Sequence, residues 1–549
     1  MSSFFVKPAS QRKRKRNDEG GNRRSDRQGK VSTRPQKRIR EDSTGDSSIS
    51  GSDSEDLQGD GEETSHTLSE SDSSDEDDGD AASRRTKLAA RYLENSRNEI
   101  LAEGFDAKDV DNELLAQRMG DKLREDTAEN RGRMYRWIAN DYNYDECVTA
   151  KFSNGPGALT GVAVCDPYIY TTSKDLRLSK WKLTSGASTL SSKPKLVGSS
   201  RGDRSRKRDI NYDQHTNDIF CVAASQDGRF VATGGKDRRL VVWDAATLKP
   251  LRTFAHHRDA VNSVCFRRGT NQLFSASRDR TVKIWSLNEL AYVETLYGHQ
   301  DEILDVASLN QEHCVTAGAR DKTARYWKVV DESQLIFRGG GGHNSLAKRG
   351  KREEGREGIE QKCFHEGSTD RVAMLDEDTF VTGSDNGALS LWDVHKKKPV
   401  YTYPLAHGIE APKQLDEVSA ELFPDPRVLP EPQPRWITAL ACVPYSNLIF
   451  TGSWDGHVRV WKVSEDRRSL EPLGALQTST GPAMVNGELG PDEGKFKGVI
   501  NDLAVFETGK KGKEDLSVVA VTGKEQRMGK WEDAGGRNAC IIVQIPRKP

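Results

Sequence analysis

Three short stretches of the sequence repeat one arrangement of side chains that could do chemistry. Each places an aspartate among basic residues and six residues before a tryptophan: "GGKDRRLVVW" with Asp237, "SASRDRTVKIW" with Asp279 and "GARDKTARYW" with Asp321. The first two stretches also follow a histidine, and a hydroxyl side chain stands four residues before each aspartate. The two complete sets are His215, Thr233, Asp237 and Trp243, and His257, Ser275, Asp279 and Trp285. A serine, a histidine and an aspartate together are the side chains of a nucleophilic hydrolase.

The recurrence of these sets favours a structural role over a catalytic one. One active site does not need copies in successive repeats, so we predict that the aspartates accept hydrogen bonds within their own folding units. Four residues before Asp321, Ala317 takes the hydroxyl position, and we expect an incomplete network in that repeat. Asn386 and Glu525 replace the aspartate in two further copies. We therefore expect no catalytic residues and no enzymatic activity.

The basic residues beside the aspartates indicate a different chemistry. They recur next to the same turn in four successive repeats, so we expect them to form a basic arc on one face of the molecule, which a phosphate backbone would fit. The alternative is that each is an ordinary solvated surface charge. With no RNA-recognition motif in the chain, RNA would be recognised by shape, together with a bound protein. The candidate residues are Lys174, Lys236, Arg238, Arg239, Arg278, Arg280, Arg320 and Lys322.

Seven tryptophans define the elements that carry these residues. They are Trp181, Trp243, Trp285, Trp327, Trp392, Trp461 and Trp531, at spacings of 62, 42, 42, 65, 69 and 70 residues. The spacing of 42 fits the ~40–45 residues of a WD repeat, which forms one four-stranded propeller blade. The longer intervals are the same unit with insertions. We predict an all-β fold, a seven-bladed WD40 β-propeller over residues 142–549. Its seventh blade could be completed by residues 145–153 or by residues 539–546, and the sequence leaves both possibilities open.

Charge separates the N-terminal segment from this domain. Residues 1–40 hold 14 Lys/Arg and 3 Asp/Glu, whereas residues 41–80 hold 16 Asp/Glu and no Lys/Arg. Such blocks cannot bury enough apolar surface to fold, so we predict a disordered tail over residues 1–81, basic and then acidic. Its basic clusters suit nuclear import or nucleic-acid contact. The residues are Arg12, Lys13, Arg14, Lys15, Arg16, Lys37, Arg38 and Arg40.

Residues 82–141 have the composition of a helical arm, rich in strong helix formers. Apolar residues recur at three- and four-residue steps and predict one stripe on a long charged helix, which would pack on the propeller or on a partner protein. The stripe contains Val110, Leu114, Leu115, Met119, Leu123, Met134, Trp137 and Ile138.

Other sites are not indicated by the sequence. The eight cysteines form no close pairs, which suits buried thiols of a reducing compartment and excludes a zinc site of CxxC type. The N-terminus lacks the apolar run of a signal peptide, and no apolar stretch is long enough to span a membrane. We expect a soluble intracellular protein without metal or cofactor.

Several longer motifs resemble one family, the WD-repeat subunit specific to the U3 small nucleolar ribonucleoprotein (snoRNP). They include "RMGDKLREDTAENRGRMYRWIA", "CVTAGARDKTARYWKV", "ITALACVPYSNLIFTGSWDGHVRVWKV" and "GKEQRMGKW". The resemblance runs from the arm to the C-terminus, and the opening "SFFVKPASQRKRKR" is also similar to the start of that family.

The resemblance implies a non-catalytic component of the box C/D U3 particle in the nucleolus, acting in early pre-18S rRNA processing and small-subunit assembly. It implies binding to the box B/C region of U3 snoRNA together with the small protein that binds its kink-turn, and contact with other processome proteins. It places Arg320 and Lys322 on the contact face, and adds Lys524 and Arg527 from the seventh blade. Neither a membrane nor a small-molecule substrate is expected. The alternative is a WD40 adaptor for protein partners, of the ubiquitin-ligase or chromatin type, which would favour a deep pocket over a basic arc.

Overall fold

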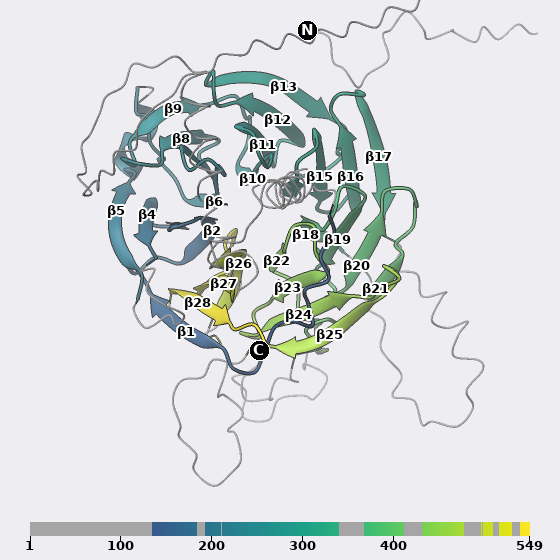
Figure 1. Ribbon diagram of the computed structural model, residues 1–549. Helices are drawn as coiled ribbons and strands as arrows, with labels where there is room; N and C mark the ends of the chain where they lie inside the picture. The colour runs from purple at the N-terminus through teal and green to yellow at the C-terminus, as the bar shows by residue number, and fades with distance from the viewer. Residues whose placement is uncertain are drawn as a thin grey trace, which may run out of the picture. The chain divides into compact units, whose positions relative to one another are not determined.

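Seven four-stranded antiparallel sheets form a ring, as Figure 1 shows. The computed structural model describes residues 134–183, 193–209, 211–339, 367–410, 431–476, 496, 498–508, 515–529 and 538–548. The predicted all-β propeller with seven blades is therefore confirmed. The predicted tail, with its basic clusters, and most of the predicted arm lie outside the described residues. No helix among the described residues is long and apolar enough to cross a membrane.

Each blade is numbered by its order in the chain and runs outward from its first strand. Blade one contains β2 (Leu159–Cys165), β3 (Tyr168–Ser173), β4 (Arg177–Lys182) and β5 (Lys195–Arg201). Blade two contains β6 (Ile219–Ala224), β7 (Phe230–Gly235), β8 (Leu240–Asp244) and β9 (Pro250–Phe254). Blade three contains β10 (Val261–Phe266), β11 (Gln272–Ser277), β12 (Thr281–Ser286) and β13 (Ala291–Tyr297). Blade four contains β14 (Ile303–Ser308), β15 (His313–Gly318), β16 (Thr323–Lys328) and β17 (Ser333–Arg338).

The remaining three blades follow the same pattern, with a shortened outer strand in the fifth. Blade five contains β18 (Thr369–Met374), β19 (Thr379–Ser384), β20 (Leu389–Asp393) and β21 (Tyr401–Tyr403). Blade six contains β22 (Ala439–Cys442), β23 (Leu448–Gly452), β24 (Val458–Val463) and β25 (Leu470–Ala475). Blade seven contains β26 (Val499–Thr508), β27 (Asp515–Gly523), β28 (Ala539–Ile545) and β1 (Val148–Phe152).

Burial explains why these segments become strands. The second strands, such as β7 and β11, are short runs of apolar and small residues that are buried along almost their whole length. A run of this kind suits a strand covered on both faces, and here the neighbouring blades provide both covers. Outer strands such as β13 expose several of their residues. The hydrophobic core is therefore divided among the contacts between successive blades rather than gathered at one centre.

The ring is closed by pairing the two ends of the propeller. β1 pairs antiparallel with β28, from Val148 opposite Gln544 to Phe152 opposite Cys540. Both segments that the sequence left as alternatives belong to the seventh blade, β28 as its third strand and β1 as its outer strand. Trp531, the tryptophan that the spacing assigned to this blade, is not part of its third strand, which begins at Ala539. Trp531 itself lies outside the described residues.

The end of the predicted helical arm is not helical. Arg136 forms a parallel bridge with Ser446, and its backbone N–H donates to the carbonyl oxygen of Tyr445 at 2.8 Å. Its side chain forms a salt bridge with Glu507 at 2.8 Å. Residues 134–141 therefore lie along the turns of blades six and seven, whose backbone groups pair with them in place of the helical i to i−4 bonds. The predicted stripe is wrong for its last three members, Met134, Trp137 and Ile138.

Candidate nucleic-acid interface

The aspartate of the turn between the second and third strands is held in a buried network. In blade three, His257 Nδ1 lies 2.9 Å from Asp279 Oδ2 and His257 Nε2 lies 2.8 Å from Ser275 Oγ. The indole N–H of Trp285 donates to Ser275 Oγ at 2.8 Å. Blade two repeats this arrangement with His215, Thr233, Asp237 and Trp243. The predicted structural networks of these two blades are confirmed.

Two more networks differ from the prediction. Blade four was expected to lack a hydroxyl, but Thr316 lies 2.7 Å from His299 Nε2 and accepts from Trp327 at 2.9 Å. The turn in this blade has one residue more than its counterparts, so counting back from the aspartate reached Ala317 instead. Sequence reasoning missed blade six altogether. There His407 lies 2.9 Å from Asp455 and 2.9 Å from Thr451. The spacing from histidine to aspartate, 48 residues there against 22 elsewhere, concealed it.

The electrostatics of the networks suit a scaffold. Burial raises the pKa of Asp279, but hydrogen bonds from His257, Thr281 and the Arg258 N–H outweigh burial and hold this pKa well below its usual range. Burial also lowers the pKa of His257, although Asp279 opposes that effect. A neutral imidazole that donates to Asp279 then accepts from the hydroxyl of Ser275. The hydroxyl is fully buried and committed to its neighbours, so it is not available as a nucleophile.

The turn that carries the aspartate has an unusual backbone. In blade two the Arg238 N–H donates to the Gly235 carbonyl at 3.3 Å, and Arg238 itself has φ of 66°. This is a tight turn followed by a left-handed residue, a position that favours glycine. Blades five and six do place glycine there, Gly387 and Gly456, each with φ of 72°. Blades three and four instead place Arg280 and Lys322 there, with φ of 68° and 51°, and blade one places the buried Leu176 there with φ of 62°.

Most of the predicted basic residues lie exposed on this end of the propeller. The turns between second and third strands share one end because every blade runs in the same sense. Arg278 pairs with Glu302 at 2.9 Å. The other exposed members of the set form no ion pair with a described residue. We call the following residues the basic arc: Lys236, Arg238, Arg278, Arg280, Arg320 and Lys322, together with Lys524 from blade seven.

Two predicted residues are occupied by internal contacts. Lys174 pairs with Glu525 at 2.9 Å and donates to the carbonyl of Gly529 at 2.8 Å, which attaches blade one to the turn of blade seven. Arg239 donates to the backbone carbonyls of Asp209 and Gln214. Its guanidinium therefore fixes the connection between blades one and two, and neither side chain is free to meet a phosphate without giving up these bonds.

The expectation that Arg527 lies on the exposed face is wrong. It is 4% exposed, and it donates to the carbonyls of Asn262 at 3.1 Å and Leu304 at 3.2 Å, in blades three and four. The turn of blade seven thus crosses the centre of the ring. Burial there lowers the pKa of Arg527 to about 10. We do not include Arg527 in the basic arc.

Arg527 belongs to a buried ionic cluster that sequence reasoning did not find. Arg371 on β18 lies 3.7 Å from Asp305 on β14 and 3.7 Å from Asp502 on β26. Asp305, Arg371 and Asp502 each follow a β-bulge in the first strand of their blade. A bulge changes the direction of the side chains beside it. A charged residue inside an otherwise apolar strand, as in "ILDV" (303–306), was the available signal.

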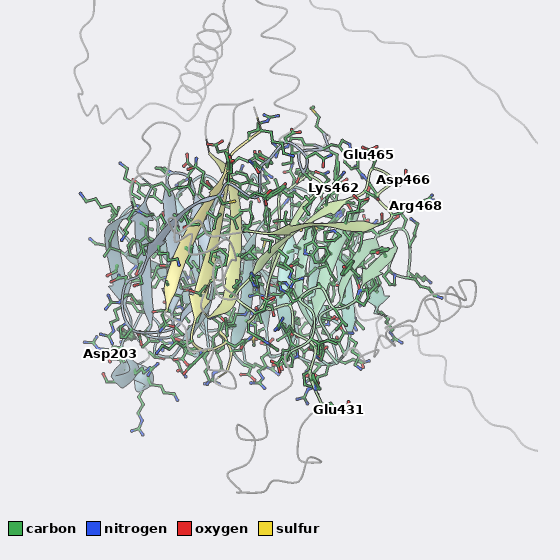
Figure 2. The ribbon with its side chains drawn as sticks, turned by 90° about the horizontal axis from the view of Figure 1, so that it is seen from below. Asp203, Glu431, Lys462, Glu465, Asp466 and Arg468 are labelled. Atoms are coloured by element: carbon green, nitrogen blue, oxygen red, sulfur yellow. The ribbon has the colours of Figure 1, made fainter. Side chains whose placement is uncertain are left out.

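The connection between blades one and two adds charge at the same end. A short 3-10 helix, η2 (Arg204–Arg208), is capped by Asp203, whose side chain accepts from the Ser205 N–H. All five residues of η2 are exposed, and the Arg204 guanidinium holds the segment to Asp218 at 2.7 Å. Figure 2 shows Asp203 and Glu431 at one end of the propeller. Lys462, Glu465, Asp466 and Arg468 lie at the other.

Comparison with known proteins agrees with this architecture. The family model "WD domain, G-beta repeat" matches residues 207–244, 248–286, 291–328 and 427–462. Ribosomal RNA-processing protein 9 of Saccharomyces cerevisiae is 33% identical over 84% of this chain and 89% of its own length. U3 small nucleolar RNA-interacting protein 2 of Homo sapiens is 35% identical over 85% of this chain and 83% of its own length. The chain belongs to the WD-repeat family of U3 snoRNP-associated proteins.

Two solved structures of this family support the assignment. The crystal structure of the RRP9 WD40 repeats covers 73% of this chain and 98% of its own, with a TM-score of 0.55 and 30% identity. The structure of U3-55K covers 72% of this chain at the same TM-score and identity. The family match therefore rests on both sequence and fold.

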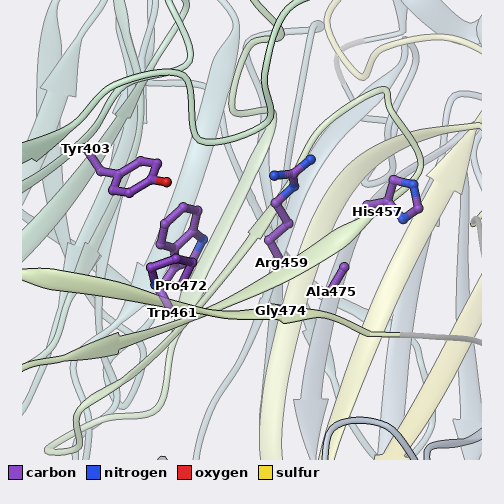
Figure 3. Close-up of a pocket in the computed structure, with 7 residues that line it drawn as sticks. All are labelled: Tyr403, His457, Arg459, Trp461, Pro472, Gly474 and Ala475. Atoms are coloured by element: carbon purple, nitrogen blue, oxygen red, sulfur yellow. The ribbon is translucent and has the colours of Figure 1, made fainter. Parts of the chain in front are cut away.

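A cavity of 320 Å³ lies in the side of blade six, away from the ring centre. Figure 3 shows the hydroxyl of Tyr403 and the guanidinium of Arg459 facing each other across it. The Tyr403 and Trp461 rings, 4.7 Å apart, line it with Pro472. An adaptor for protein partners would present a deep pocket on the open face, which this cavity does not provide. Among the described residues, no group of three or more metal-ligating side chains is present.

Proposed function

We propose that this protein is a U3 snoRNA-binding component of the U3 snoRNP that acts in pre-rRNA processing. Relatives that match along most of their length carry the names U3 small nucleolar RNA-interacting protein 2 and ribosomal RNA-processing protein 9. The role is non-catalytic, because the His/Asp sets are buried networks that recur in four blades. The basic arc binds the phosphate backbone, and a kink-turn-binding protein shares the box B/C region of the RNA.

The observation that carries this proposal is the residue type at the left-handed turn position. A non-glycine residue there costs ~1 kcal/mol. Arg238, Arg280 and Lys322 accept that cost in three successive blades. Folding does not require a cation at this position, since Leu176, Gly387 and Gly456 make the same turn in blades one, five and six. Backbone strain of this kind concentrates at functional sites, and three exposed cations in a row fit an extended polyanion.

The test is a charge reversal of the arc with a matched control. Full-length protein carrying Arg238→Glu, Arg280→Glu, Arg320→Glu and Lys322→Glu should lose most of its affinity for U3 RNA bearing the kink-turn protein. The control reverses Lys249, Lys397, Lys398 and Arg468, which are exposed in turns between third and fourth strands. Those turns lie at the opposite end of the propeller because the strands are antiparallel.

Salt dependence identifies the kind of interaction. Removing one phosphate-binding side chain should flatten the slope of log affinity against log salt by up to roughly 0.9, the value for duplex DNA. Circular dichroism checks that both proteins fold. Equal binding of wild type and the arc variant at every salt concentration would refute the proposed interface.

The proposed location is the nucleus and nucleolus, which the basic clusters of residues 1–40 support. Deletion of residues 1–40 should abolish nucleolar enrichment in cell imaging while leaving the thermal melt unchanged. Undiminished enrichment of the truncated protein would remove the targeting role of this segment.

A further inference from the structure

The basic arc changes character in blade six. The residue immediately before the turn aspartate is Lys236, Arg278 and Arg320 in blades two, three and four. In blade six the same position holds Trp454, before Asp455, and this residue is partly exposed. Since the turns share one end of the propeller, this indole lies on the same face as the basic arc.

A second tryptophan stands beside it. Trp436 is also partly exposed, and the two ring centroids are 5.7 Å apart at an interplanar angle of 50°. The hydroxyl of Ser453 donates to the carbonyl oxygen of Trp436 at 2.6 Å. The next residue, Ile437, is fully buried and anchors the segment. Both indoles are therefore attached to rigid parts of blade six.

These two tryptophans do not form the blade core. The core position is filled by Trp461, which is 1% exposed and donates to Thr451. The corresponding tryptophans of blades one to five are all 5% exposed or less. The other blades make this turn with a charged residue at the position of Trp454, such as Lys236, Arg278 or Asp385, so the turn does not need an aromatic residue there.

Cations flank the tryptophan pair. Arg435 precedes Trp436 and donates to the carbonyl of His407 at 3.2 Å. Arg459 lies 3.6 Å from Asp455, the residue after Trp454, and its side chain is 34% exposed. Aromatic faces next to guanidinium groups are how proteins hold unpaired bases, since every base has a π-face while its phosphate remains charged.

We propose that Trp454 and Trp436 form a stacking platform for an unpaired RNA nucleotide at the end of the basic arc. This inference rests on the proposed function and extends it, because the arc binds backbone of any kind whereas the platform requires a base outside a helix. Blade five separates the two with Asp385, which accepts from the Gly367 N–H and adds no cation. The RNA would thus cross from backbone contact to base contact between blades four and six.

Two RNA probes separate these contacts: a blunt hairpin, and the same hairpin with a single-stranded uridine extension. Trp454→Ala in the full-length protein should weaken binding to the extended hairpin by roughly tenfold, as alanine substitution of a stacking residue does. Binding to the blunt hairpin should stay at the wild-type value. The salt slope should also stay unchanged, because stacking releases no counterions. Trp454→Phe keeps an aromatic face and should retain most of the affinity.

The matched control is Trp137→Ala, since Trp137 is 42% exposed and follows Arg136, which bridges Ser446 in the turn between the first and second strands of blade six, at the opposite end of the propeller. Crosslinking of 5-bromouridine in the extension should label Trp454 and not Trp137. Wild-type affinity of Trp454→Ala for the extended hairpin would overturn the platform even if the arc variants still lose binding. Loss of a co-purifying protein with unchanged RNA affinity would also overturn it and assign the platform to a protein partner. If the arc variants bind RNA as tightly as wild type while Trp454→Ala loses binding, the proposed function fails instead.

Discussion

Asp279 is an ionised carboxylate that stabilises the fold of its blade. It accepts from His257, from the Thr281 hydroxyl and from two backbone N–H groups. Together these bonds join the turn, the inner connection and the third strand of blade three. The same side chains would suggest an active site if they occurred once. Because the same set recurs in blades two, four and six, its role is structural: it holds the strands of each blade together.

Asp279→Ala should destabilise the protein without a specific RNA defect. The loss of a buried charged acceptor costs about 1.5–3 kcal/mol, because its donors are left unpaired. Thermal melts and RNA titrations of the two proteins would check this. A wild-type melting temperature combined with abolished RNA binding would instead place Asp279 in the binding site.

Acid should weaken the fold through the network histidines. Burial lowers the pKa of His257, His299 and His407 below the ordinary value of 6.5. Unfolded chains therefore take up protons at a higher pH than the folded protein, and stability falls as the pH falls below about 6.5. Melting temperatures from pH 7.5 to 5 should decline. His395→Gln, which changes an exposed histidine, should leave the profile unaltered; a flat profile in wild type would contradict the linkage.

At the scale of the element, the turn between second and third strands combines two roles. Its aspartate stabilises the blade, and its flanking residues form the basic arc. The left-handed position holds leucine in blade one, a cation in blades two to four and glycine in blades five and six, so stability and binding can be changed separately. The short outer strand β21 and the extended β5 show that the outer parts of the blades vary more freely than these turns.

Arg280→Gly should separate the two roles. Glycine relieves the left-handed strain, worth ~1 kcal/mol, while its greater unfolded freedom offsets part of that gain. We expect stability equal to or slightly above wild type, and weaker binding to U3 RNA. Denaturant titration and RNA binding measure the two effects. A destabilised Arg280→Gly protein would mean that the arginine contributes to folding.

The strands and their turns could be predicted from the sequence because the evidence is local. A tryptophan near the end of the third strand and an aspartate six residues earlier mark blades one to four and blade six within one short window. Thr316 was missed because one extra residue shifts the count. The helix predicted for residues 134–141 is wrong because their pairing partner, Ser446, lies far along the chain in blade six. The placement of Arg527 failed for the same reason, since no local pattern reveals a turn that crosses the ring.

At the scale of the whole molecule, three devices hold the ring together. β1 and β28 join the ends, inner strands pack side by side around the axis, and Arg527 connects blade seven to blades three and four. The blade count was predictable because the repeat is periodic. The choice of closing strand was not, since both terminal segments have the pattern of a strand.

Arg527→Ala should destabilise the propeller. It should not remove a phosphate contact. The carbonyls of Asn262 and Leu304 lose their donor in a buried site, at a cost of about 1–3 kcal/mol. The slope of RNA affinity against salt should remain that of wild type. Lys524→Ala, an exposed neighbour in the same turn, should leave the melting temperature unchanged. A flattened salt slope for Arg527→Ala would restore it to the binding face.

The pairing of β1 with β28 also determines when the ring can close during protein synthesis. Val148 leaves the ribosome 396 residues before its partner Gln544, which at roughly 5–20 residues per second is a delay of about 20–80 s. During that interval the first strand waits unpaired while six blades form behind it. A nascent chain that stops anywhere short of the last strand can never close its ring. Only a completely translated molecule would then present the continuous face on which a ribonucleoprotein could be assembled.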